Sequence, residues 1–150
     1  MFKKLGEREI YKGARITVVS ASFESPDGER FERDVVHHPG AVGIVPVVDE
    51  GTAVLLVRQF RAPVDRELLE IPAGLRDRAD EPTIETARRE LVEEVGMRAG
   101  RLERLCEFVN SPGFCDEVVQ VFLATGLRDV PDDRQGIEER AMVVVRVPLE

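Results

Sequence analysis

The segment Arg89-Glu90-Leu91-Val92-Glu93-Glu94-Val95-Gly96 decides the fold of this chain, because it describes one helix with an acidic side and an apolar side. Glu90 and Glu94 are four residues apart, slightly more than one helical turn, and therefore lie on the same face. Glu93 borders that face. The pattern predicts a helix that packs with one side and presents carboxylates with the other.

The residues before this segment supply the rest of the helix. Negative charge at Asp80 and Glu81 suits the positive end of a helix dipole, and Pro82 suits the first turn. Gly96 is well placed to end the helix in a left-handed conformation. Apolar residues recur with helical period and predict the buried stripe, which consists of Ile84, Ala87, Leu91 and Val95.

The acidic face has two interpretations. Glutamates at this spacing repel one another, and Arg89, four residues before Glu93, offsets only part of the charge. Taken alone, such a run is most often a solvated helix face. The alternative is a site for a hard divalent cation, which prefers oxygen ligands. The turn Ile71-Pro72-Ala73-Gly74 precedes the helix at a distance suited to folding back over it, which favours the cation site.

The remaining chain is predicted to be mostly extended, which gives an α/β fold with a mixed sheet. A turn at Ser25-Pro26-Asp27-Gly28 connects two β-rich runs and predicts an N-terminal hairpin. Continuous apolar runs predict buried strands, whereas residues 62–81 and 126–140 are predicted to be turns and loops. The strands expected after the hairpin are 41–48, 53–57, 101–110, 117–125 and 141–147.

Length and charge restrict the classes of function. The chain has 150 residues, the size of one domain, and a net charge of -8, which disfavours binding to a nucleic acid backbone. No run approaches the length of a membrane span, and the N-terminus lacks the apolar core of a signal peptide. Cys106 and Cys115 have no metal-ligand spacing. We therefore expect a cytoplasmic protein with reduced thiols.

A longer pattern resembles a known family. Gly74, Glu81 and the segment Arg89–Met97 are similar to the Nudix box GX5EX7REUXEEXGU, in which U is a bulky aliphatic residue. One departure is that six residues, not five, separate Gly74 from Glu81; the extra residue falls before the helix. Further elements resemble the ADP-ribose pyrophosphatase branch of the Nudix hydrolases: Arg58–Arg61, Glu70–Gly74 and Ser111–Gly113.

The resemblance covers nearly the whole chain and implies its architecture. It implies one Nudix domain over residues 1–150, with an N-terminal hairpin over about 1–38 and a catalytic core over about 39–150, folded as an α/β/α sandwich. In this branch the N-terminal region pairs across a two-fold axis, so the implied state is a homodimer. The C-terminal helix that members of the branch usually carry has no counterpart here.

The resemblance also implies a reaction and a metal site. The reaction is the Mg2+- or Mn2+-dependent hydrolysis of ADP-ribose, a small nucleotide substrate, to AMP and ribose 5-phosphate. Glu90, Glu94 and the Ala73 carbonyl are implied metal ligands, with Glu93 a ligand or a bridge. Arg89 is implied to hold the carboxylates in place, and Glu81 to support the junction between loop and helix.

Other implied roles fall outside the box. The general base comes from an acidic loop beyond it, for which Glu138 and Glu139 are the candidates and Glu139 the preferred one. Arg61, and less strongly Arg58, would contact phosphate; strand alternation places these two on opposite faces. Glu70 would contact the terminal ribose. Pro112 matches the proline typical of the branch about fifteen positions past the box and is a candidate for substrate binding.

Two alternatives remain open at this point. The chain could act on another dinucleotide or nucleotide sugar, such as NADH or GDP-mannose, with the same chemistry and different base and sugar pockets. It could also be a module that binds ADP-ribose without cleaving it. The three box glutamates argue against the second alternative.

Overall fold

The computed structural model describes residues 1–131, 133–134 and 136–149, and only the backbone of residue 138. Its contacts divide the chain into two compact units. The first consists of Met1–Gly40 and Phe108–Val119, and the second of Ala41–Glu107 and the residues from Gln120 onward. The first unit is therefore discontinuous in sequence.

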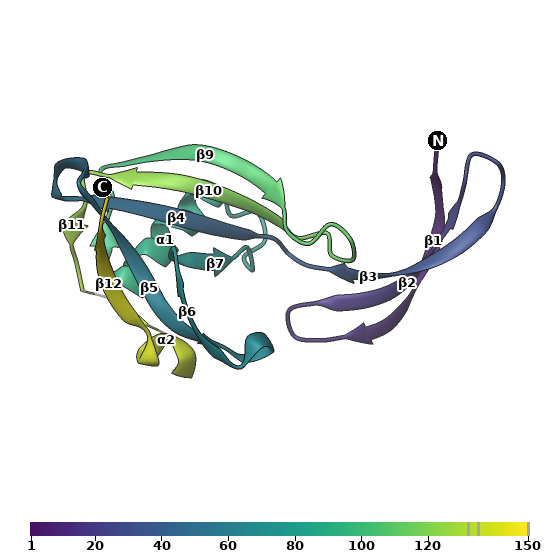
Figure 1. Ribbon diagram of the computed structural model, residues 1–150, viewed down its shortest axis with the longest axis horizontal. Coiled ribbons are helices and arrows are strands. Elements are labelled where there is room, and N and C mark those ends of the chain that lie inside the picture. Colours follow the sequence, from purple (N-terminus) through teal and green to yellow (C-terminus); the bar gives the residue numbers. More distant parts are fainter. Residues whose placement is uncertain (132, 135, 150) are drawn as a thin grey trace. The chain divides into compact units, whose positions relative to one another are not determined.

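The first unit contains a three-stranded antiparallel sheet in the order β1-β2-β3 (Figure 1). Strands β2 (Thr17–Glu24) and β3 (Arg30–His37) form the expected hairpin, with Thr17 opposite His37. A further strand, β1 (Lys3–Lys12), pairs with β2 and was not singled out from the sequence. Every residue of β1 is exposed, so it lacks the apolar alternation that marks a half-buried strand.

The segment after β9 docks along the end of β3 within the same unit. The Val36 N–H donates to the Phe114 carbonyl at 2.7 Å, and the Asp116 N–H donates to the Val36 carbonyl at 3.1 Å. The carboxylate of Asp116 accepts the His38 N–H at 2.9 Å and lies 2.6 Å from His37 Nδ1. The other ring nitrogen of His37, Nε2, lies 3.1 Å from Glu7 Oε2 on β1. His37 therefore links β1, β3 and the docked segment.

The larger sheet has seven strands. Its main path is β12-β5-β4-β10-β9, with β6 paired to β5 and β7 to β4. Figure 1 shows β4 and β10 running in the same direction, whereas β12, β6 and β7 pair antiparallel with their neighbours, so the sheet is mixed as predicted. The strands are β4 (Ala41–Val48), β5 (Ala53–Arg61), β6 (Arg66–Glu70), β7 (Ala73–Leu75), β9 (Arg101–Val109), β10 (Val118–Thr125) and β12 (Val143–Pro148).

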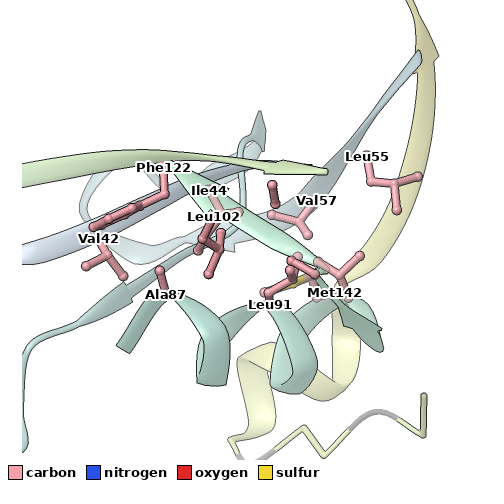
Figure 2. Packing of buried hydrophobic residues seen from close by; sticks show 12 residues of the cluster. Val42, Ile44, Leu55, Val57, Ala87, Leu91, Leu102, Phe122 and Met142 are labelled. Carbon is pink, nitrogen blue, oxygen red and sulfur yellow. The ribbon is translucent and has the colours of Figure 1, made fainter. Parts of the chain in front are cut away.

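Helix α1 (Thr83–Val95) packs its apolar stripe against this sheet. Ala87 and Leu91 are fully buried, and Figure 2 shows them directed toward sheet residues such as Val42 and Ile44. Gly96 ends the helix with φ +68°, and its N–H donates to the carbonyls of Leu91 and Val92. The stripe and the glycine stop were both predicted, and together they fix the rotation of α1 about its own axis.

Some elements were not anticipated. Strand β5 continues through Arg61, β6 lies in the stretch predicted as turns, and the short helix α2 (Ile137–Ala141) lies in the stretch predicted as a loop. A two-stranded pairing of β8 (Met97–Arg98) with β11 (Arg128–Asp129) and the 3-10 turns Asp49–Gly51 and Ala62–Val64 complete the described elements. In the described part of the chain, each helix is too short or too polar to cross a bilayer.

Candidate active site on the acidic face of α1

Strand β7 comes very close to the acidic face of α1 at Gly74. A Cβ atom built on Gly74 would lie 1.9 Å from Glu90 Cδ and 2.2 Å from Glu90 Oε1. Because real Cβ atoms do not approach other heavy atoms so closely, only glycine leaves room for this carboxylate. Strand β7 thus forms a cradle around the Glu90 side chain, and Glu90 is 9% exposed.

The residue before this glycine binds the second carboxylate of the face. The Ala73 N–H donates to Glu94 Oε2 at 3.0 Å. The side chain of Glu94 is buried, and burial raises the pKa of Glu94 to about 8 against the hydrogen bond from Ala73. Burial likewise raises the pKa of Glu90 to about 7, with Arg89 opposing the shift and Glu93 adding to it. Burial therefore disfavours the charged form of both carboxylates.

Arg89 is the cation that touches this face directly. Its Nη1 donates to Glu90 Oε1 at 2.6 Å and to Glu93 Oε2 at 3.0 Å. Its Nη2 donates to Glu81 Oε2 at 3.2 Å. One guanidinium therefore joins three of the four box carboxylates and restricts how far their side chains can turn.

A second cation reaches the site from β5. Arg61 donates to Glu70 through Nε at 3.0 Å and through Nη2 at 2.6 Å, and its charge also lowers the pKa of Glu94. Arg58 is exposed, whereas its neighbour Gln59 is buried, so the predicted alternation along β5 is present. The structure brings Arg61 and Glu70 to the acidic face and turns Arg58 away from it.

The candidates for the general base, and Pro112 as a candidate for substrate binding, differ in where the structure places them. Glu139 is half-buried on α2, and its charge raises the pKa of both Glu90 and Glu94, so it lies within electrostatic range of them. The side chain of Glu138 lies outside the described part of the structure. Pro112 is exposed in the first unit, where the segment containing it docks on β3.

The donor set suits a divalent metal ion in its chemistry. Its side-chain members are carboxylate oxygens, the ligands that hard cations such as Mg2+ prefer, and burial raises the pKa of Glu90 and Glu94, which a bound cation would oppose. Among the described residues, no three carboxylate, imidazole or thiol groups already converge on one point. Glu90 instead contacts Arg89, and Glu94 contacts the Ala73 N–H. The residues fit a cation that draws these side chains together.

With this geometry in view, the family of the chain is clear. Residues 37–149 match the NUDIX domain, and the chain belongs to that family. The ADP-ribose pyrophosphatase of Bacillus subtilis is 40% identical over 148 residues, covering 99% of this chain and 79% of the relative. The ADP-ribose pyrophosphatase of Mycobacterium tuberculosis is also 40% identical over 148 residues, covering 99% and 71%.

A solved structure agrees with these relatives. A crystal structure described as an ADP compounds hydrolase superposes with a TM-score of 0.82 at 28% identity, and the match covers 98% of this chain and 78% of the other. The prediction of a Nudix fold of the ADP-ribose pyrophosphatase branch is therefore confirmed.

Two polar residues at this site were not found from the sequence. Gln59 is buried beside Glu70, with Nε2 3.5 Å from Glu70 Oε2. Thr86 is fully buried in α1, and its hydroxyl donates to Glu81 Oε2 at 2.9 Å. The signal for Thr86 was present: it lies four residues before Glu90 and therefore on the same helix face as the box carboxylates. No comparable signal marks Gln59, whose partner depends on the pairing of β5 with β6.

Proposed function

We propose that this protein is a divalent-metal-dependent hydrolase that cleaves the diphosphate of ADP-ribose to AMP and ribose 5-phosphate. The observation that carries the proposal is the cradle at Gly74, which fits the Glu90 carboxylate beside the buried Glu94. The likeness to two ADP-ribose pyrophosphatases over nearly the whole chain supports the choice of substrate.

The proposed ligands of the metal are Glu90, Glu94 and the Ala73 carbonyl, with Glu93 as a ligand or bridge. A bound Mg2+ or Mn2+ would screen the charge of the diphosphate and lower the pKa of a water molecule. Arg89 holds Glu90 and Glu93 in position through its two hydrogen bonds.

The protein's own groups account for the remaining roles. We assign the general base to Glu139, which would take a proton from the attacking water; Glu138 is the second candidate. The water oxygen bonds to one phosphorus, the P–O–P bridge breaks, and the bridging oxygen leaves with the other phosphate. Arg61 binds the diphosphate, and Glu70 holds the Arg61 guanidinium through two hydrogen bonds. In the same proposal Glu70 also reaches the terminal ribose.

The test is product release from ADP-ribose by wild type and Glu94→Gln. We expect EDTA to stop turnover and added Mg2+ to restore it, and the variant to lose at least about 100-fold in kcat, because loss of a ligand costs more than loss of the groups that support one. Glu85→Gln is the matched control, since Glu85 is on the same helix with a side chain 54% exposed. Unchanged turnover in Glu94→Gln would overturn the metal assignment.

The same assay separates the alternatives. A panel containing ADP-ribose, NADH and GDP-mannose ranks the substrates by kcat/KM, and a preference for another member would move the proposal to that substrate. Binding of ADP-ribose by calorimetry without release of AMP would identify a binding module instead. A hydrolase gives product from at least one member of the panel at fixed Mg2+.

A cytoplasmic homodimer completes the proposal. Strand β1 is exposed along its whole length and presents the apolar side chains of Leu5, Ile10 and Tyr11, which a second copy would cover. Both cysteines are free, as expected in a reducing compartment. Light scattering at micromolar concentration tests the assembly, and a monomeric mass would count against it.

A further inference from the structure

Thr86 has an environment that its place in the family motif does not explain. Its side chain is fully buried on α1, whose other buried residues are Ala87, Glu90, Leu91, Glu94 and Val95. Its hydroxyl lies 2.9 Å from Glu81 Oε2 and 3.4 Å from the Pro82 carbonyl. A hydroxyl has one proton to donate, and the shorter contact to a charged acceptor is the stronger hydrogen bond.

The acceptor is itself part of a chain of contacts. The same oxygen of Glu81 that accepts from Thr86 also accepts from Arg89 Nη2 at 3.2 Å. The other terminal nitrogen of Arg89 donates to Glu90 at 2.6 Å and to Glu93 at 3.0 Å. The hydroxyl is therefore connected to two of the proposed metal-binding carboxylates through two intervening side chains.

We propose that Thr86 is a positioning residue for the metal site: its hydroxyl fixes the Glu81 carboxylate, which holds Arg89 in the rotamer that orients Glu90 and Glu93. The inference rests on the proposed function for its consequence, although the hydrogen-bond relay itself does not require a metal.

The chemistry of the position favours this role over simple packing. Valine has nearly the same shape as threonine and would fill the same space without a polar atom that needs a partner. A buried hydroxyl costs free energy unless it is hydrogen-bonded, so its complete burial requires an acceptor at this place. The hydroxyl gives Glu81 a second donor on the oxygen that Arg89 contacts, while Arg78 lies 3.7 Å from the other oxygen.

The experiment compares Thr86→Val with Thr86→Ser and with the control Thr83→Val. Thr83 is the first residue of α1, and in the described part of the chain its side chain makes no hydrogen bond, so the control makes the same change on the same helix. Mn2+ affinity is measured by calorimetry without nucleotide. We expect Thr86→Val to weaken Mn2+ binding roughly 3- to 10-fold, the effect of one hydrogen bond, and the other two variants to bind like wild type.

A double-mutant cycle with Glu81→Gln tests the route. If Thr86 acts through Glu81, the effect of Thr86→Val on Mn2+ affinity disappears in the Glu81→Gln background. A residue that only packs would give additive effects in the two backgrounds, and additivity would overturn the inference. Glu81→Gln alone should weaken Mn2+ binding as Thr86→Val does. If Thr86→Val does not fold, unchanged Mn2+ affinity in Glu81→Gln would refute the relay.

A metal-free measurement separates this inference from the proposed function. The carboxyl 13C chemical shifts of Glu90 and Glu93 report their hydrogen bonds to Arg89, and we expect both to move in Thr86→Val and to stay in Thr86→Ser. Unchanged shifts in Thr86→Val would refute the relay. Moved shifts in a protein that neither binds Mn2+ nor cleaves ADP-ribose would instead retain the relay and refute the proposed function.

Discussion

Replacing Gly74 by alanine tests the architecture of the site with the smallest possible change. The new methyl group would lie 1.9 Å from Glu90 Cδ, whereas two carbon atoms in contact are about 3.5 Å apart, so one of them must move by about 1.5 Å. Strand β7 is held to β4 by its pairing of Gly74 with Val42, and the Glu90 carboxylate is the end of a side chain. We therefore expect the carboxylate to be displaced.

The displacement predicts a large loss of activity with little loss of stability. Misplacing a catalytic group by about 1 Å can cost about 100-fold in rate, so Gly74→Ala should lose about that factor or more in kcat/KM for ADP-ribose. Gly74 does not have a positive φ, so the backbone itself tolerates alanine and the thermal midpoint should change little. Steady-state kinetics and thermal unfolding measure the two effects.

A matched control is available on β1. Gly6 is also a strand glycine without a positive φ, and a Cβ atom there would meet nothing within 4 Å. Gly6→Ala should therefore keep wild-type kinetics. If Gly74→Ala retained activity within a few fold of wild type, the Glu90 carboxylate would not need its observed position, and the assignment of this residue to the metal site would be wrong.

Two further predictions concern stability. Leu91→Ala removes a fully buried side chain from the core and should lower the free energy of unfolding in urea by about 3 kcal/mol. The control Leu69→Ala changes a residue that is 49% exposed and should lower it by less than about 1 kcal/mol. Equal losses in the two variants would contradict the assigned core. Hydrogen bonds to Asp116 and Glu7 raise the pKa of His37 above its usual 6.5, so its stabilising effect is complete below pH 6.5 and is lost as the pH rises through the raised value. As the pH rises from 6.5 through the raised pKa of His37, the thermal midpoint of wild type should therefore fall relative to that of His37→Gln. If NMR showed the His37 ring to titrate at or below pH 6.5, its hydrogen bonds to Asp116 and Glu7 would be contradicted.

The sequence was sufficient for the elements whose signals are local. The period of the apolar stripe and the glycine at position 96 define α1 within a residue of its observed ends, because amphipathic packing and a left-handed stop act at fixed spacing. The apolar runs 41–48 and 53–57 mark buried strands for the same reason. The helical period alone then places Glu90 and Glu94 together on one face, beside the apolar stripe.

The remaining features depend on contacts between distant residues. Strand β1 is charged and exposed, so only its pairing with β2 makes it a strand. The Arg61–Glu70 ion pair depends on the pairing of β5 with β6. The proline and the polar residues of that stretch predicted only turns and loops, so this pairing was not found from the sequence. The family motif located Gly74 in sequence, although only the structure shows that its missing side chain makes room for Glu90.

The discontinuity of the first unit has a practical consequence for shortening the chain. A protein that began at Ala41 would lose β1, β2 and β3 but keep residues 108–119, whose backbone groups at Phe114 and Asp116 bond to Val36. Those groups would be left without their partners, and unpaired backbone groups can bond to other chains. Studies of the catalytic half in isolation would therefore need to replace or trim that loop as well as the N-terminal residues.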